Sequence, residues 1–195
     1  MVTEWNGPAK TLLYWIVATL IGWSAAAGLV LLAQELLPAI STPALFIVLL
    51  LPGVAQWLLL RRLLAIGPLW IATAPLATIA FVGILMSVPV MLWETVDSEA
   101  PATLAGVYAI LGALLGFLQW LVLRRQVRAA WVWVAASILG VAAGIEIVLF
   151  TGLVDRSGLG AFVVVVLLYA ATTGAALARL ASQTAGNPSE GFVAA

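Results

Sequence analysis

The chain of 195 residues contains no cysteine and no histidine. Disulfides, thiolate clusters, the usual zinc sites and histidine-ligated haem are therefore excluded, because each of them needs one of these side chains. Catalysis by a Ser-His-Asp triad or a Cys-His pair is excluded for the same reason. We predict no catalytic, cofactor-binding or metal-binding residue, no cofactor and no enzymatic activity.

Charged residues are also scarce. They make up 8% of the chain, against about 25% in an ordinary soluble domain. The net charge is zero, so there is no clustered cationic surplus to bind nucleic acid. Apolar residues make up 65%, which predicts an integral membrane protein whose main partner is the lipid bilayer.

Six apolar stretches are long enough to span a bilayer. They cover residues 12–32, 44–60, 69–93, 103–123, 130–153 and 159–180. Continuous apolar runs of this length favour helices, since lipid-spanning strands alternate over about ten residues. We predict an all-α polytopic bundle of six transmembrane helices in a single domain, residues 1–195, with short tails at 1–10 and 181–195.

The basic residues predict the orientation. All but one fall on the same side of the six-span chain, and only Arg156 falls on the other. Those on the shared side are Lys10, Arg61, Arg62, Arg124, Arg125, Arg128 and Arg179. By the positive-inside rule both termini are cytoplasmic.

Most tryptophans fall near the same predicted interface, where indole rings commonly lie. They are Trp15, Trp57, Trp70, Trp120, Trp131 and Trp133. We interpret this group as interfacial. Trp23 lies deeper in the first span and is expected to pack against a neighbouring helix.

One string occurs twice, as GVAQWLLLRR at 53–62 and GFLQWLVLRR at 116–125. We call the distance in sequence between these two copies the repeat offset. The string predicts a duplicated helical hairpin. A third hairpin is degenerate, because Gly174 occupies the expected glutamine position and only Arg179 remains of the basic pair. We predict two or three tandem units, residues 11–62, 68–125 and 130–180, around a pseudo-threefold axis along the membrane normal.

The string also suggests roles for its residues. The expected interface anchors are Trp57, Arg61, Arg62, Trp120, Arg124 and Arg125. Gln56 and Gln119 lie one turn deeper and need hydrogen-bond partners. They either contact neighbouring helices or line a cytoplasmic vestibule.

Glu146 is the one ionisable residue predicted well inside a span. With Gln56 and Gln119 it forms the candidate intramembrane polar site, either a proton or cation site or a carboxyl bonded to a neighbouring helix through Tyr108, Tyr169 or Ser87. Close helix packing is predicted from four glycines, Gly112, Gly116, Gly140 and Gly144. Pro52, Pro75 and Pro89 are expected to bend the second and third helices.

The repeated string resembles that of multi-pass bacterial membrane proteins, found for instance in cyanobacteria and green non-sulfur phototrophs, which carry Gly-x-x-Gln-Trp-Leu-Val-Leu-Arg elements. The resemblance covers the second to fifth helices and implies a fold and a bacterial origin, without an activity. It thereby implies the bacterial cytoplasmic (inner) membrane, with a thylakoid or other photosynthetic membrane as the alternative. We expect a structural, accessory or assembly subunit that packs with other membrane subunits or with itself. The alternative is a small solute or ion transporter or channel, proton-coupled through Glu146.

Overall fold

The computed structural model describes residues 7–36, 48–87, 101–127 and 129–186. All regular structure in these ranges is helical, so the predicted all-α class is confirmed for them. The elements are α1 (Pro8–Leu36), α3 (Leu50–Leu63), the 3-10 helix η2 (Pro68–Ala72), α4 (Thr73–Ser87), α6 (Pro101–Leu123), α7 (Trp131–Phe150), α8 (Leu153–Arg156) and α9 (Gly158–Gly186). Helix α1 begins within the predicted N-terminal tail, and helix α9 extends into the predicted C-terminal tail.

Five helical segments are long and apolar enough to cross a membrane, which indicates a multi-pass membrane protein. They are Pro8–Leu32, Pro68–Ser87, Thr103–Leu123, Trp131–Phe150 and Gly158–Ser182. The predicted second span is described only in part. Its helix α3 has 14 residues, and residues 44–47 lie outside the described ranges, as do residues 88–93 of the predicted third span.

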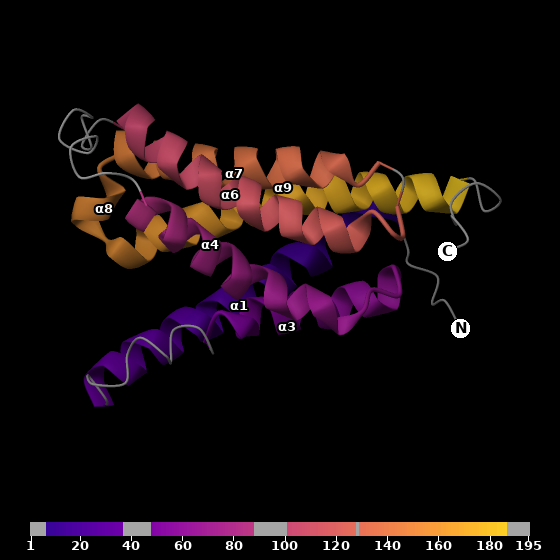
Figure 1. Cartoon of the computed structure of the whole chain (residues 1–195), viewed down its shortest axis with the longest axis horizontal. Coiled ribbons are helices and arrows are strands. Elements are labelled where there is room, and N and C mark those ends of the chain that lie inside the picture. Colours follow the sequence, from indigo (N-terminus) through magenta and orange to yellow (C-terminus); the bar gives the residue numbers. More distant parts are fainter. Residues whose placement is uncertain (1–6, 37–47, 88–100, 128, 187–195) are drawn as a thin grey trace.

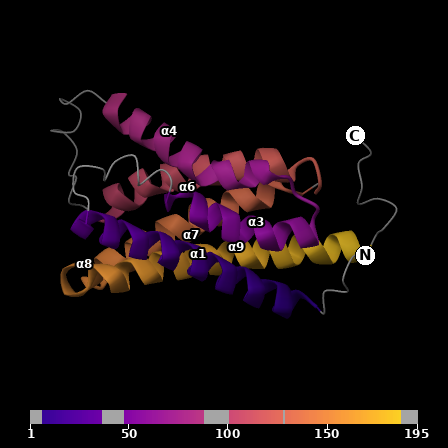
Figure 2. The same cartoon turned by 90° about the horizontal axis from the view of Figure 1, so that it is seen from below.

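The helices close into a ring of contacts. Helix α1 contacts α3, α3 contacts η2, and η2 leads into α4; α4 contacts α6, α6 contacts α7, α7 contacts α9, and α9 returns to α1. Figures 1 and 2 show the helices gathered towards the end where both chain termini lie, while α1 and α4 diverge from the others at the opposite end. The ring is therefore tightest at the end nearest the termini.

Prolines begin helices here. Pro52 and Pro75 are each the third residue of their α-helix, α3 and α4. The first turn of an α-helix has no internal partner for its N–H groups, so a proline there removes no helical hydrogen bond. Each proline follows an interruption of its predicted span, a turn at Leu49 before α3 and the change from the 3-10 helix η2 to α4. Pro89 lies outside the described residues.

Glycines let α7 approach both of its neighbours. A Cβ added at Gly112 or Gly116 of α6 would lie 2.9 Å or 2.8 Å from an atom of Ser137 on α7. A Cβ at Gly140 of α7 would lie 2.7 Å from the Tyr169 Cα on α9, and Gly144 is similarly close to α9. Since real side chains almost never come this near a backbone, glycine is required along these internal seams.

Candidate functional site

Three tryptophan side chains meet where the helices of the ring converge. Trp15 comes from α1, Trp70 from η2 and Trp133 from α7, and each side chain is 0% exposed. The ring centroids are 5.2 Å apart for Trp15 and Trp133, 5.6 Å for Trp70 and Trp133, and 6.3 Å for Trp15 and Trp70. The interplanar angles of 76° to 83° are the edge-to-face geometry that aromatic rings favour. We call these three residues the Trp triad.

Each indole N–H of the Trp triad donates a hydrogen bond to a side chain on the preceding helix of the ring. The bonds run from Trp70 Nε1 to Gln56 Oε1 (3.2 Å), from Trp133 Nε1 to Gln119 Oε1 (2.7 Å) and from Trp15 Nε1 to Thr173 Oγ1 (2.9 Å). A buried indole N–H without an acceptor is costly, so the three acceptors allow the triad to be fully buried. The first two bonds are equivalent, because Gln119 and Trp133 lie one repeat offset after Gln56 and Trp70.

The two glutamines each join three helices. Gln56 of α3 also donates from Nε2 to Thr19 Oγ1 on α1 at 3.2 Å. Gln119 of α6 also accepts a hydrogen bond from the Tyr169 hydroxyl on α9 at 3.1 Å. The side chains of Gln56 and Gln119 are 3% and 1% exposed. Such burial does not fit amides that line an open vestibule, so the cross-helix interpretation is the better one.

A second contact recurs with the repeat. A Cβ on Gly53 would lie 2.9 Å from the Ile71 Cα, and a Cβ on Gly116 would lie 3.0 Å from the Val134 Cα. The two pairs have the same separation in the chain, and the repeat offset carries the first pair onto the second. In each copy, the glycine of the string therefore lies against the backbone of the residue that directly follows a tryptophan of the triad.

Helix α9 presents a threonine where α3 and α6 present glutamine. The acceptor for Trp15 is Thr173, one residue before the glycine that the sequence pattern placed there. Leu177, four residues after Thr173, is 0% exposed, as are Leu60 and Leu123 four residues after the two glutamines. The three leucines cover the triad from the end of the bundle that bears the arginine pairs, and all belong to one buried cluster.

The interfacial interpretation is wrong for the Trp triad, because these three rings face other helices and not headgroups. It fits Trp131, whose side chain is 64% exposed. Trp23 packs against Phe162 of α9, with ring centroids 6.3 Å apart at 68°. Tryptophan position along a span thus predicts depth, while the direction in which the ring points decides its role.

The anchor residues of the string share one geometry. The Arg61 Cζ lies 4.8 Å from the centroid of the Trp57 ring, and the Arg124 Cζ lies 5.0 Å from that of Trp120. All four arginines of the two pairs are exposed, while both tryptophans are half-buried. A guanidinium stacked on an indole face is held in place with its N–H donors at the edge still available.

Glu146 does not join the glutamines. It is exposed and lies more than three helical turns after Trp133 on α7, about 20 Å along the helix. The helix ends at Phe150, four residues later, so the carboxyl is about 6 Å from the helix end and within reach of the headgroups. Of the expected partners, Tyr169 is bonded to Gln119 and Ser87 to the Gly83 carbonyl. The three residues of the predicted polar site are therefore not together: Gln56 and Gln119 bond to the Trp triad, and Glu146 lies apart from them.

Within the described part of the chain, no group of three or more Asp or Glu side chains is placed to hold a metal ion. The polar side chains that accept from the Trp triad are Gln56, Gln119 and Thr173, and the two glutamines also bond to Thr19 and Tyr169. These hydrogen bonds link the helices of the bundle.

No protein-family model, curated protein or solved structure matches this chain.

Replacing Gln119 with leucine is expected to lower the free energy of unfolding by about 1 to 2 kcal/mol, because two buried donors, of Trp133 and Tyr169, lose their acceptor. Thermal unfolding in one detergent measures this. Tyr169→Phe removes one of the donors, so the double variant should lose less than the sum of the two single losses. Strict additivity would contradict the hydrogen bond between Gln119 and Tyr169.

Some of these residues were not predicted as site residues, namely Thr19, Thr173, Tyr169 and the Trp triad itself. A usable signal existed in the spacing. Each glutamine of the string is followed 14 residues later by a tryptophan of the triad, Trp70 or Trp133. In two helices joined by a short loop, residues equally far from the loop lie at the same depth, so this spacing could have paired them.

Proposed function

We propose that this chain is a non-enzymatic integral membrane protein that serves as a structural, accessory or assembly subunit within a membrane complex. The observation that carries the proposal is that the polar side chains around the triad are used for bonds between its own helices. Gln56, Gln119 and Thr173 each accept from a triad indole.

One buried hydroxyl stands apart from these bonds. Among the described residues, the Ser137 Oγ is the buried side-chain polar atom without a hydrogen-bond partner. A Cβ on Gly116 would lie 3.1 Å from this oxygen, so the hydroxyl is enclosed in the seam between α6 and α7. A single enclosed hydroxyl is too little to form a solute-binding site. It is therefore compatible with a structural role for the interior of the bundle.

The outer faces support the same proposal. Large apolar side chains are exposed on several helices, among them Leu31 (60%), Met86 (79%), Leu139 (63%) and Phe150 (89%). In a bilayer these faces contact lipid or another membrane protein. A bundle with a bonded interior and broad apolar faces suits packing within an assembly.

We also propose that the bundle consists of three tandem hairpins with six spans and both ends in the cytoplasm of a bacterial cell. The alternation of the Trp triad around the ring supports a pseudo-threefold arrangement, since each ring comes from the first helix of one hairpin. The contacts that recur at the repeat offset support descent of the first two hairpins from one unit. The basic residues near the triad support placing that end in the cytoplasm.

The transport alternative has weaker support. A proton-coupled path needs Glu146 to communicate with polar groups across the bundle, and this residue is exposed on α7 about 20 Å along the helix from the level of Trp133. The Trp triad and the leucines packed on it also fill the space between the helices at the arginine-bearing end. The geometry therefore favours a subunit over a transporter.

Purification from native membranes in a mild detergent tests the proposal. We expect the tagged full chain to elute as a defined assembly larger than the monomer, with a companion protein or further copies at fixed stoichiometry by mass spectrometry. The variant Glu146→Gln should give the same assembly, because an exposed carboxyl near the helix end is not needed to hold the bundle.

Two results would contradict this. One is recovery of the wild-type chain as a monomer at native expression level in several mild detergents. The other is a pH-dependent solute flux in liposomes that Glu146→Gln abolishes, which would replace the subunit proposal by the transport alternative.

A further inference from the structure

Most of the described basic residues lie at one end of the bundle. They are Lys10 at the start of α1, Arg61 and Arg62 at the end of α3, Arg124 and Arg125 after α6, and Arg179 near the end of α9. The acidic residues of the described ranges belong to the opposite end of the bundle, Glu35 at the end of α1, Glu146 near the end of α7 and Asp155 in α8. Within the described part of the chain, the basic end thus has no carboxylate beside its arginines.

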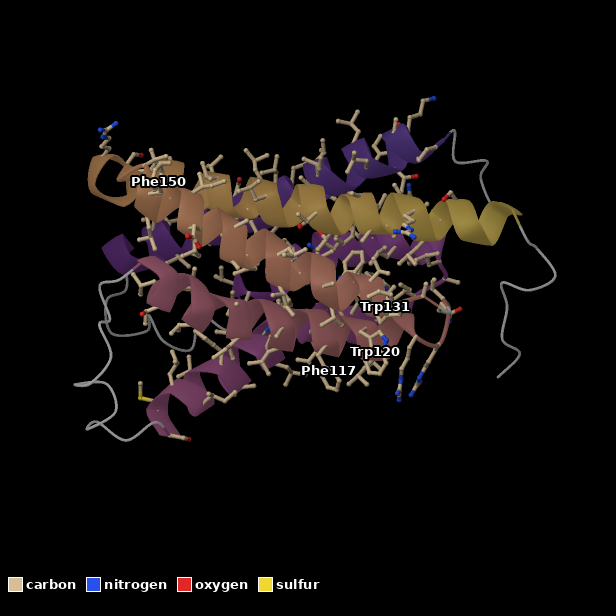
Figure 3. All side chains as sticks on the ribbon, turned by 90° about the horizontal axis from the view of Figure 1, so that it is seen from above. Phe117, Trp120, Trp131 and Phe150 are labelled. Carbon is tan, nitrogen blue, oxygen red and sulfur yellow. The ribbon has the colours of Figure 1, made fainter. Side chains whose placement is uncertain are left out.

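Three aromatic rings lie at the same end of the bundle as one of the arginine pairs (Figure 3). Trp120 lies beneath Arg124 and packs against Phe117, with ring centroids 5.4 Å apart. Phe117 is 48% exposed, and Trp131, at the start of the next helix, is 64% exposed. Figure 3 shows Phe117, Trp120 and Trp131 together at one end of the bundle, far from Phe150 at the other. We call Phe117, Trp120, Arg124, Arg125 and Trp131 the α6–α7 corner.

The equivalent place in the first copy of the string has an arginine pair but lacks the exposed aromatic rings. Arg61 stacks on Trp57 in the same way, and Arg62 is exposed beside it. The residues that correspond to Phe117 and Trp131 are Val54 and Pro68. We call Val54, Trp57, Arg61, Arg62 and Pro68 the α3–η2 corner. The chain thus contains its own control, with equal charge and fewer exposed rings.

We propose that the α6–α7 corner is a binding site for an anionic phospholipid. The guanidinium of Arg124, held over Trp120, and that of Arg125 bind the phosphodiester, because arginine donates to phosphate oxygens through a planar fork. Phe117 and Trp131 contact the glycerol and upper acyl chain, the region where aromatic side chains are most favourable. Basic clusters on the cytoplasmic side of membrane helices suit anionic headgroups for this electrostatic reason. The site does not depend on whether the chain is a subunit or a transporter.

Native mass spectrometry of the purified full chain, titrated with phosphatidylglycerol or phosphatidylcholine of identical acyl chains, tests the site. Wild type should retain phosphatidylglycerol about tenfold more tightly than phosphatidylcholine. Arg124→Gln with Arg125→Gln should weaken phosphatidylglycerol binding about tenfold, while Arg61→Gln with Arg62→Gln should weaken it by no more than about threefold. Phe117→Val, which copies the α3–η2 corner, should weaken both lipids.

Several results would overturn the proposal. Equal losses for the two arginine pairs would mean a diffuse basic surface without a site. Equal affinity for the two lipids, or displacement of phosphatidylglycerol by inorganic phosphate at similar concentration, would exclude recognition of a whole anionic lipid. Near-ultraviolet circular dichroism checks that each variant is folded; should the arginine variant fail to fold, unchanged binding in Phe117→Val would itself contradict the site.

Discussion

Replacing Trp133 with alanine is expected to lower the free energy of unfolding by about 3 to 5 kcal/mol. The indole is 0% exposed and packs edge-to-face on both Trp15 and Trp70. Its loss leaves a cavity at the meeting point of three helices and removes the donor to Gln119. Thermal or denaturant unfolding in a fixed detergent measures the loss, which should also appear as poor recovery of folded protein.

Trp131→Ala is the matched control for this prediction. It is the same substitution two residues earlier on α7, at a side chain that is 64% exposed. Two residues are about 200° apart around a helix, so one ring faces inward and the other faces the surroundings. Trp131→Ala should change stability by less than about 1 kcal/mol. A loss as large as that of Trp133→Ala would contradict the burial of the Trp triad.

Gly112→Val is the second substitution with a large expected effect. A Cβ at Gly112 would lie 2.9 Å from the Ser137 carbonyl oxygen and 3.1 Å from the Ile138 Cα. Both are backbone atoms that cannot rotate away, so α6 and α7 must separate. We expect a loss of about 2 to 3 kcal/mol, at the upper end of the usual cost of overpacking, measured by unfolding in the same detergent.

Gly106→Val controls for the intrinsic effect of valine in α6. A Cβ at Gly106 meets no atom within 4 Å, while the change in helix propensity is the same at both positions. We expect this variant to be as stable as the wild type or slightly more stable. Equal destabilisation by the two substitutions would mean that the seam between α6 and α7 is not closely packed.

The amino-acid sequence by itself determined the helical class and the separation of charge along the bundle. Both follow from one-dimensional information. Long apolar runs must form helices in a bilayer, because every backbone group needs an internal partner there. The positions of the arginines in the loops between these runs determine which helix ends share a side. The need of Gln56 and Gln119 for partners was also evident, since an unpaired buried amide is costly.

Only the tertiary structure decided which face of each helix points inward. A soluble helix reveals its inner face by polar residues on the other side, but a membrane helix is apolar all round. The sequence therefore does not distinguish Trp131 from Trp133, although Trp131 is exposed and Trp133 is fully buried. The same ambiguity concealed the exposure of Glu146. The sequence also did not show that Thr173, one residue before the expected glutamine position, accepts from Trp15. A shift of one residue turns the helix face by about 100°.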